Sequence, residues 1–491
     1  MLSRGFHLSG ELPAWQSRGW TLRKGCRLQW VVAYSLLACA TSAGAQNNQQ
    51  KLDREFKSAQ AQYDAGQFQQ AAEQLEDLLK RVPNSFEVHE LLGQVYTSLS
   101  QDEKATGQLQ EAVRLKPDSG PARTNLAAAL LHAGKTAPAG EQFRRALKLE
   151  PESFDTNHNL GEFYVQTGKI EAAIPFLEHA QEINPGSYDN GYDLAMAELL
   201  TGKLADARRR AQGLMKERDT GEIHDLLGQI EEKDGKFIAA ANEFQTAAHL
   251  DPSEENLFDW GSELLLHRTY EPATEVFEEA VRRYPNSSRL LIGLAMALDW
   301  RGKFDEAVKA LLAAADLNPL DARCYLFLSK AYDSSPNQAA DVIERFRRYA
   351  ELQPGNALAQ YYYAMSLWKG KRVGDASLDL QAVQALLEKA ISLDGSLAEA
   401  DVQLGNLYAD QHKYAESIPY YVRSLALNPN LSDAHYRLGQ DYVHTGRKDQ
   451  AQKEFDIYQH LRAQHLAEVD KEWAEVQQFV YAEKAASGTK P

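Results

Sequence analysis

Histidine and cysteine are the side chains in this sequence that are best suited to bind metal ions or to move protons near neutral pH. The histidines are scattered, and His460 and His465 lie five residues apart, a spacing that does not place two ligands on one face of a helix. Five others have no H-E-x-x-H neighbour and no cysteine partner, namely His132, His158, His224, His435 and His444. The sequence therefore predicts no metal site and no cofactor.

Motifs for nucleophilic catalysis and for phosphate binding are also missing. The sequence contains no G-x-x-x-x-G-K-[ST], no G-x-G-x-x-G and no G-x-S-x-G. Of the three cysteines, Cys26 and Cys39 lie close to the N-terminus, and we expect Cys324 to be a buried, inert thiol within a helix. We therefore expect a protein that is not an enzyme.

Prolines and glycines recur in the sequence with a period of 34 residues, and this period indicates the helices that make up the fold. A proline lacks an N–H group and ends a helix, whereas a glycine accepts the left-handed backbone that closes one. Between a glycine and the next proline, apolar residues recur at helical spacing of three and four. Each period is therefore predicted to be a helical hairpin whose apolar face is covered by its neighbours. The spacing is carried by Pro83, Pro117, Pro151 and Pro185 and by Gly134, Gly168 and Gly202.

These hairpins resemble the tetratricopeptide repeat family, of which the chain is identified as an exported bacterial member. The fourth repeat shows the family pattern in Leu160, Gly161, Tyr164, Gly168, Ala173, Leu177, Ala180 and Pro185, and the twelfth shows it in Leu438, Gly439, Tyr442, Gly446, Ala451 and Phe455. The resemblance covers about twelve repeats between residues 52 and 461. It implies an all-α fold, a right-handed α-solenoid of about twelve helical hairpins with a C-terminal capping helix.

The same pattern gives the expected organisation of the chain. We expect a signal peptide over 1–45, a linker over 46–51, repeats one to six over 52–253, repeats seven to nine over 254–356, a longer repeat with an insertion over 357–397, repeats eleven and twelve over 398–461, and a capping helix with a tail over 462–491. The capping helix would place Leu461, Val469, Trp473, Val476 and Val480 on one face, against the last repeat. A dimer contact through Trp473 is the alternative.

In the family, the first helix of each hairpin lines a concave groove. The resemblance places a row of amides and carboxylates there, formed by Asn125, Asn159 and Asp193, with Asp259 further along the chain. An amide both donates and accepts hydrogen bonds, so such a row can hold an extended peptide of any sequence. The alternative is that these side chains are ordinary solvated surface groups.

Apolar side chains fall at groove-lining positions in the fifth, seventh and eighth repeats. Aromatic anchors and adaptable methionines are typical of contact sites, although some of these residues would instead pack between helices as core. The candidates are Tyr192, Met196, Phe258, Ile292, Met296 and Trp300.

The charge of the chain restricts the partners. A net charge of −16 repels phosphate backbones, so we expect no nucleic-acid partner. Acidic residues recur at the second position of the repeats, at Glu87, Asp155, Asp189, Glu222, Glu255, Glu399 and Asp433. The expected partner is a protein or peptide with basic and apolar character, and the sequence sets no oligomeric state.

The N-terminus resembles an export signal. Basic residues precede a 13-residue apolar run over 28–40, and the small residues Ala43 and Ala45 follow in the arrangement that signal peptidase cleaves. This predicts cleavage between Ala45 and Gln46 and a periplasmic or secreted protein. The alternative is lipidation of Cys39 within Leu-Leu-Ala-Cys, which would anchor the chain to a membrane. No later segment predicts a transmembrane span.

These observations predict a non-catalytic scaffold that binds peptide or protein partners in the concave groove of the repeat superhelix. A rigid solenoid offers many weak contacts without an ordering cost. The alternative is a structural or assembly subunit of a cell-envelope machine, such as pilus assembly, secretion or outer-membrane biogenesis.

The two readings of the N-terminus predict different mature chains. We expect mass spectrometry of the exported protein to find an unmodified N-terminus at Gln46, because the small-residue cleavage site follows the apolar run directly. A mature chain that begins with an acylated Cys39 would contradict this prediction and support the membrane anchor.

Overall fold

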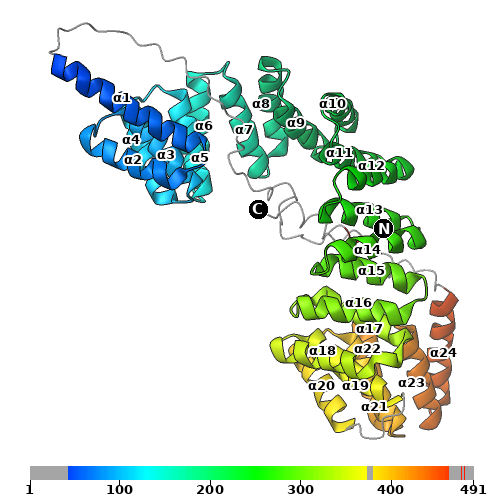
Figure 1. Ribbon diagram of the computed structural model, residues 1–491. Helices are drawn as coiled ribbons and strands as arrows, with labels where there is room; N and C mark the ends of the chain where they lie inside the picture. The colour runs from blue at the N-terminus through cyan, green and yellow to red at the C-terminus, as the bar shows by residue number, and fades with distance from the viewer. Residues whose placement is uncertain (1–42, 373–379, 464–476, 478–479, 481–491) are drawn as a thin grey trace. The chain divides into compact units, whose positions relative to one another are not determined.

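The computed structural model describes residues 43–372, 380–463, 477 and 480, and over these residues it is built from α-helices (Figure 1). It contains 24 α-helices and one short 3-10 helix, and no strand occurs in the described part of the chain. The predicted all-α fold is therefore confirmed. The chain divides into two compact bodies, one that ends at Lys236 and one that begins at Phe237. This boundary lies inside the range 52–253 that we expected to hold six repeats.

The N-terminal body contains eleven of the described helices. They are α1 (Ala43–Asp64), α2 (Phe68–Arg81), α3 (Phe86–Ser98), α4 (Asp102–Leu115), α5 (Gly120–His132), α6 (Thr136–Leu149), α7 (Phe154–Gln166), α8 (Ile170–Ile183), α9 (Tyr188–Leu200), α10 (Leu204–Glu217) and α11 (Gly221–Lys233).

The C-terminal body contains the remaining described helices. They are α12 (Phe237–Leu250), α13 (Glu254–Leu266), α14 (Tyr270–Arg283), α15 (Ser288–Trp300), α16 (Phe304–Leu317), α17 (Ala322–Ser334), the 3-10 helix η2 (Pro336–Gln338), α18 (Ala339–Leu352), α19 (Ala357–Arg372), α20 (Leu380–Leu393), α21 (Ala398–Asp410), α22 (Tyr414–Leu427), α23 (Ser432–His444) and α24 (Lys448–Ala463).

A proline followed two residues later by a serine separates many of the hairpins. Pro151 lies just beyond α6, and the Ser153 hydroxyl accepts a hydrogen bond from the backbone N–H of Thr156, which caps α7. Such a cap satisfies one of the N–H groups that a helix leaves unpaired at its start. The same cap begins other first helices at Ser85, Ser119, Ser187, Ser253 and Ser287, so one local signal sets where each of these helices starts.

The turns inside most of the described hairpins have a left-handed backbone, whereas Ser335 and the 3-10 helix η2 join α17 to α18 without one. Gly168, between α7 and α8, has φ +72°, which a glycine adopts without a steric penalty. Three hairpins place another residue at this position, namely Ser100 (φ 55°), Arg268 (φ 59°) and His412 (φ 62°). The turn geometry is thus retained where the glycine is not.

Helices pack closely where one side of the contact lacks a side chain. The ring of Phe277 on α14 is fully buried, and it lies against Gly261 on α13 and Gly293 on α15. A Cβ atom added at Gly293 would lie 2.5 Å from Phe277 Cε1, and one at Gly261 would lie 2.9 Å from Phe277 Cζ. Both glycines therefore set how near their helices come to α14.

Several expected segments differ from the structure or lie beyond it. Residues 46–51, expected to be a linker, belong to α1, because that stretch contains no proline or glycine to prevent a helix. The predicted insertion in the tenth repeat lies in part within α19, and 373–379 are outside the described residues, as are Cys39 and most of the signal peptide.

The predicted capping helix also lies mostly outside the described residues, which include Val480 but not Val469, Trp473 or Val476. Val480 is fully buried, and it belongs to the apolar cluster formed by residues between 248 and 359. The cluster of the last described repeats, which runs from Val402 to Ala451, does not contain it. Val480 therefore packs among residues from the middle of the chain, and the capping of the last repeat stays a prediction.

The packing around Phe277 gives a test of the hairpin contacts. We expect Gly293→Ala to lower the free energy of unfolding by about 1 to 3 kcal/mol, because the new methyl group overlaps a buried aromatic ring. The control is Gly355→Ala, where an added Cβ meets no atom within 4 Å and which should unfold like the parent chain in denaturant titrations. Equal stability of the two variants would contradict the proposed packing.

Candidate binding face on the first helices

The first helices of consecutive hairpins lie side by side in the N-terminal body. Helix α3 contacts α5, α5 contacts α7, α7 contacts α9, and α9 contacts α11. Because these helices repeat the same register, residues at one repeat position form a row that crosses them. We call the surface of α5, α7 and α9 that carries Asn125, Asn159 and Asp193 the first-helix face.

The two asparagines of this row are half-buried and hydrogen-bonded. The Asn125 amide donates to the carboxylate of Glu90 on α3, with 3.2 Å between Nδ2 and Oε1. The Asn159 amide donates to the backbone carbonyl of Asp155 one turn earlier, at 2.5 Å. Both bonds use the N–H side of the amide, so each amide oxygen keeps its capacity to accept a hydrogen bond from a ligand.

Glu90 is a buried acid next to this row. Glu90 is 2 % exposed, and this burial raises the pKa of its carboxyl group to about 7. The Asn125 hydrogen bond and the charge of Lys116 act in the opposite direction. Glu90 therefore changes its charge close to neutral pH, unlike a carboxylate in water.

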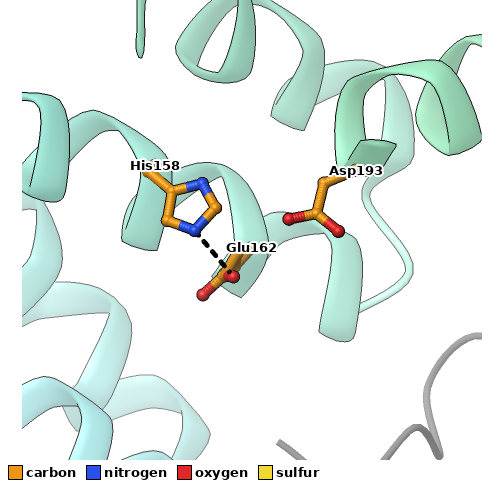
Figure 2. A group of neighbouring side chains, drawn as sticks. All are labelled: His158, Glu162 and Asp193. Carbon is orange, nitrogen blue, oxygen red and sulfur yellow. Dashed lines mark ion pairs between the residues drawn. The ribbon is translucent and has the colours of Figure 1, made fainter. Parts of the chain in front are cut away.

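A second cluster on the same face joins His158 and Glu162 of α7 with Asp193 of α9 (Figure 2). His158 and Glu162 are one helical turn apart, and their Nε2 and Oε1 atoms are 2.9 Å apart. Burial alone would lower the pKa of His158, but the charge of Glu162, the hydrogen bond to it and the charge of Asp193 outweigh it and raise the pKa to about 10. His158 and Glu162 therefore form an ion pair, and Asp193 lies beside it.

The apolar residues predicted to line the groove are mostly enclosed. Tyr192, Phe258, Ile292 and Met296 are buried, as is Asp259, whereas Met196 and Trp300 are partly exposed. Phe258, Ile292 and Met296 belong to the same core cluster of the C-terminal body, and Trp300 stacks on Tyr270 with 5.5 Å between the ring centroids. Contact of these residues with a ligand stays a prediction.

Two further predicted features can be located. Cys324 is buried on α17, and burial raises the pKa of its thiol to about 12, so the thiol is poorly reactive, as expected. Ala45 and Gln46, the predicted cleavage site, lie in the first turn of α1. Among the described helices, none has the length and apolar character needed to cross a membrane.

His158 and Glu162 belong to this face and the buried Glu90 of α3 lies next to it, but no sequence motif pointed to the three residues. A histidine motif lies within one segment, whereas the partners of His158 come partly from the next repeat. The signal that could have found them is the repeat register, which places His158 and Glu162 one turn apart and Asp193 at the equivalent of Asn159 in the following repeat.

Family models with the description "Tetratricopeptide repeat" match the chain over separate stretches. One matches residues 56–120, 124–188 and 402–465, and another matches residues 164–230 and 264–331. Together these stretches cover more than half of the chain.

The individual proteins that resemble this chain have low sequence identity to it. The human Protein O-mannosyl-transferase TMTC1 is 24% identical over 206 residues, which are 42% of this chain and 23% of that protein. A tetratricopeptide repeat protein from Parabacteroides merdae ATCC 43184 is 18% identical with a TM-score of 0.41, over 51% of this chain and 99% of that one. PilW, a widely conserved type IV pilus biogenesis factor, is 22% identical with a TM-score of 0.39, over 42% of this chain and 96% of that one.

The raised pKa of Glu90 predicts a pH-dependent stability. The folded state holds the Glu90 proton more tightly than the unfolded state, so this contribution is complete below about pH 4.5 and is lost as the pH rises through about 7. We expect Glu90→Gln to gain about 2 to 3 kcal/mol of unfolding free energy relative to the parent between pH 5 and pH 8, because the new amide keeps an oxygen for Asn125 and has no charge to bury.

The measurement is urea-induced unfolding of both chains at the two pH values. Glu103→Gln, at an exposed position of α4, is the matched control and should follow the parent at both. A difference between Glu90→Gln and the parent that does not change with pH would contradict the assignment.

Proposed function

Because the chain belongs to the tetratricopeptide repeat family, we propose that it is a non-catalytic scaffold that binds protein or peptide partners along the first-helix face. The observation that carries this proposal is the row of polar side chains that crosses three consecutive first helices, Asn125 on α5, Asn159 on α7 and Asp193 on α9. Side chains at a constant repeat position offer evenly spaced hydrogen bonds, which suits an extended backbone.

The proposed partner is a peptide or protein segment with basic and apolar character. Beside the row lie the acidic Asp155 and Asp189 in the first turns of α7 and α9, and Met196 lies partly exposed on α9. A basic segment would gain from the carboxylates, and an apolar side chain would gain from the methionine.

The proposal includes no catalytic step. The sequence carries neither a nucleophile motif nor a phosphate-binding loop, and the one cysteine outside the predicted signal peptide is buried. The matched region is 23% of the human transferase, so that enzyme's activity is not carried over to this chain. Export to the periplasm or beyond, the alternative lipid anchor at Cys39, and a role in a cell-envelope machine stay predictions.

Site-directed photo-crosslinking tests which face binds. We expect a photo-reactive amino acid at Asn159 or Met196 to form adducts with a basic, apolar probe peptide, because both positions lie on first helices and are partly exposed. The matched controls are Arg145 on α6 and Glu178 on α8, which are exposed on second helices and should give no adducts.

Affinity measurements with the same peptide complete the test. We expect Asn125→Ala combined with Asn159→Ala to weaken binding about tenfold or more, since two hydrogen bonds to the peptide backbone would be lost. Adducts confined to Arg145 and Glu178, or unchanged affinity in the double variant, would overturn the proposal.

A further inference from the structure

The cluster of His158, Glu162 and Asp193 has the composition of a metal site. One ligand atom from each of the three side chains lies within 4.8 Å of the other two. In the part of the chain that the structure describes, it is the one group of three or more such side chains that is this compact. It offers one imidazole nitrogen and two carboxylate oxygens, all from side chains that are partly shielded from water.

The helices hold these groups in place. His158 and Glu162 are separated by four residues on α7, so they project from the same face of that helix. Their side chains are 16% and 13% exposed, so neither swings freely in solvent. Asp193 reaches the pair from α9, the next first helix, which packs against α7. Figure 2 shows its carboxylate facing the other two side chains.

A buried residue outside the cluster fixes the orientation of the imidazole. Asn190 is fully buried, and its amide nitrogen donates to the Leu177 carbonyl at 2.9 Å and to Gln181 Oε1 at 2.8 Å. Its amide oxygen therefore faces His158 Nδ1, 3.0 Å away, and accepts a hydrogen bond from the N–H group at that nitrogen.

The other nitrogen of His158, Nε2, is consequently the one that is turned toward Glu162. A hydrogen bond from the remote imidazole N–H to a fixed acceptor is the arrangement that orients metal-binding histidines in proteins. Asn190 thus acts as a positioning residue, held by two bonds of its own.

We propose that His158 Nε2, a Glu162 oxygen and an Asp193 oxygen bind one divalent first-row transition ion of the Zn²⁺ type. A neutral imidazole and two carboxylates carry a charge of −2, which such an ion balances. Imidazole nitrogen favours Zn²⁺ and its neighbours over Ca²⁺ and Mg²⁺, which prefer oxygen ligands alone. As the ion binds, the proton on Nε2 leaves to the solvent, and water completes the coordination.

This site goes beyond the proposed scaffold function and does not rest on it. The peptide-binding test depends on the amides of Asn125 and Asn159, whereas the ion needs His158 and Glu162. Asp193 belongs to both the row and the metal site. A chain that fails to bind the probe peptide can still bind Zn²⁺, so the two proposals succeed or fail separately.

Calorimetric titration tests the site directly. The full chain, prepared without a histidine tag and stripped of metal with a chelator, is titrated with ZnCl₂, and we expect one strong site per chain. His158→Gln, Glu162→Gln and Asp193→Asn should each weaken Zn²⁺ binding at least tenfold, because each removes one ligand at nearly constant side-chain size. Circular dichroism of each variant should show the same helix content as the parent chain. Co²⁺ in place of Zn²⁺ should give visible absorption bands that His158→Gln abolishes.

His267→Gln is the matched control. His267 Nε2 and Glu263 Oε1 form a similar pair, four residues apart at 3.1 Å, but they belong to no group of three potential ligands among the residues described. This variant should bind Zn²⁺ like the parent. The proposal is overturned if the parent binds no Zn²⁺, if the three ligand variants bind as tightly as the parent, or if Ca²⁺ or Mg²⁺ displaces Zn²⁺ at equal concentration.

Discussion

Close approach of two helices at a residue without a side chain is the constraint on which this structure depends. Gly161 on α7 faces Leu177 on α8, and Gly439 on α23 faces the ring of Phe455 on α24. At each place a large apolar group fills the space that the glycine leaves, and Leu177 is fully buried while Phe455 is partly buried. Repetition of this contact fixes the spacing within the hairpins, and that spacing brings consecutive first helices into contact. The polar row on α5, α7 and α9 exists because of it.

Most of the fold could be predicted from residues with a local effect. A proline just beyond a second helix and a glycine in the hairpin turn recur every 34 residues, so positions such as Pro151 and Gly168 reveal the hairpins directly. The first turns of α1 could not be predicted, because a polar stretch such as 46–51 suits a linker as well as a helix. The burial of Phe258 and Met296 could not be predicted either, since it depends on which neighbouring side chains close over them.

The candidate site was predictable only in part, for a related reason. Asn125, Asn159 and Asp193 share one register and could be found by counting along the repeat. The surroundings of His158 combine Glu162 from its own helix with Asn190 and Asp193 from the next repeat. Such a neighbourhood depends on how far one hairpin is rotated relative to the next, and that rotation is a property of packing which a single repeat does not encode.

The packing of helices against their neighbours along the chain also affects how the protein folds and unfolds. Most of the packing among the described helices joins neighbours along the sequence, as in α7 and α8, or helices separated by one other, as in α3 and α5. Assembly of these helices therefore needs only short loops to close, whereas the contact of Val480 with the cluster of residues 248–359 joins more distant parts of the chain. Assembly can also begin at more than one place, and a stretch of hairpins can unravel while the others stay intact, so that pulling on the chain would extend it in steps.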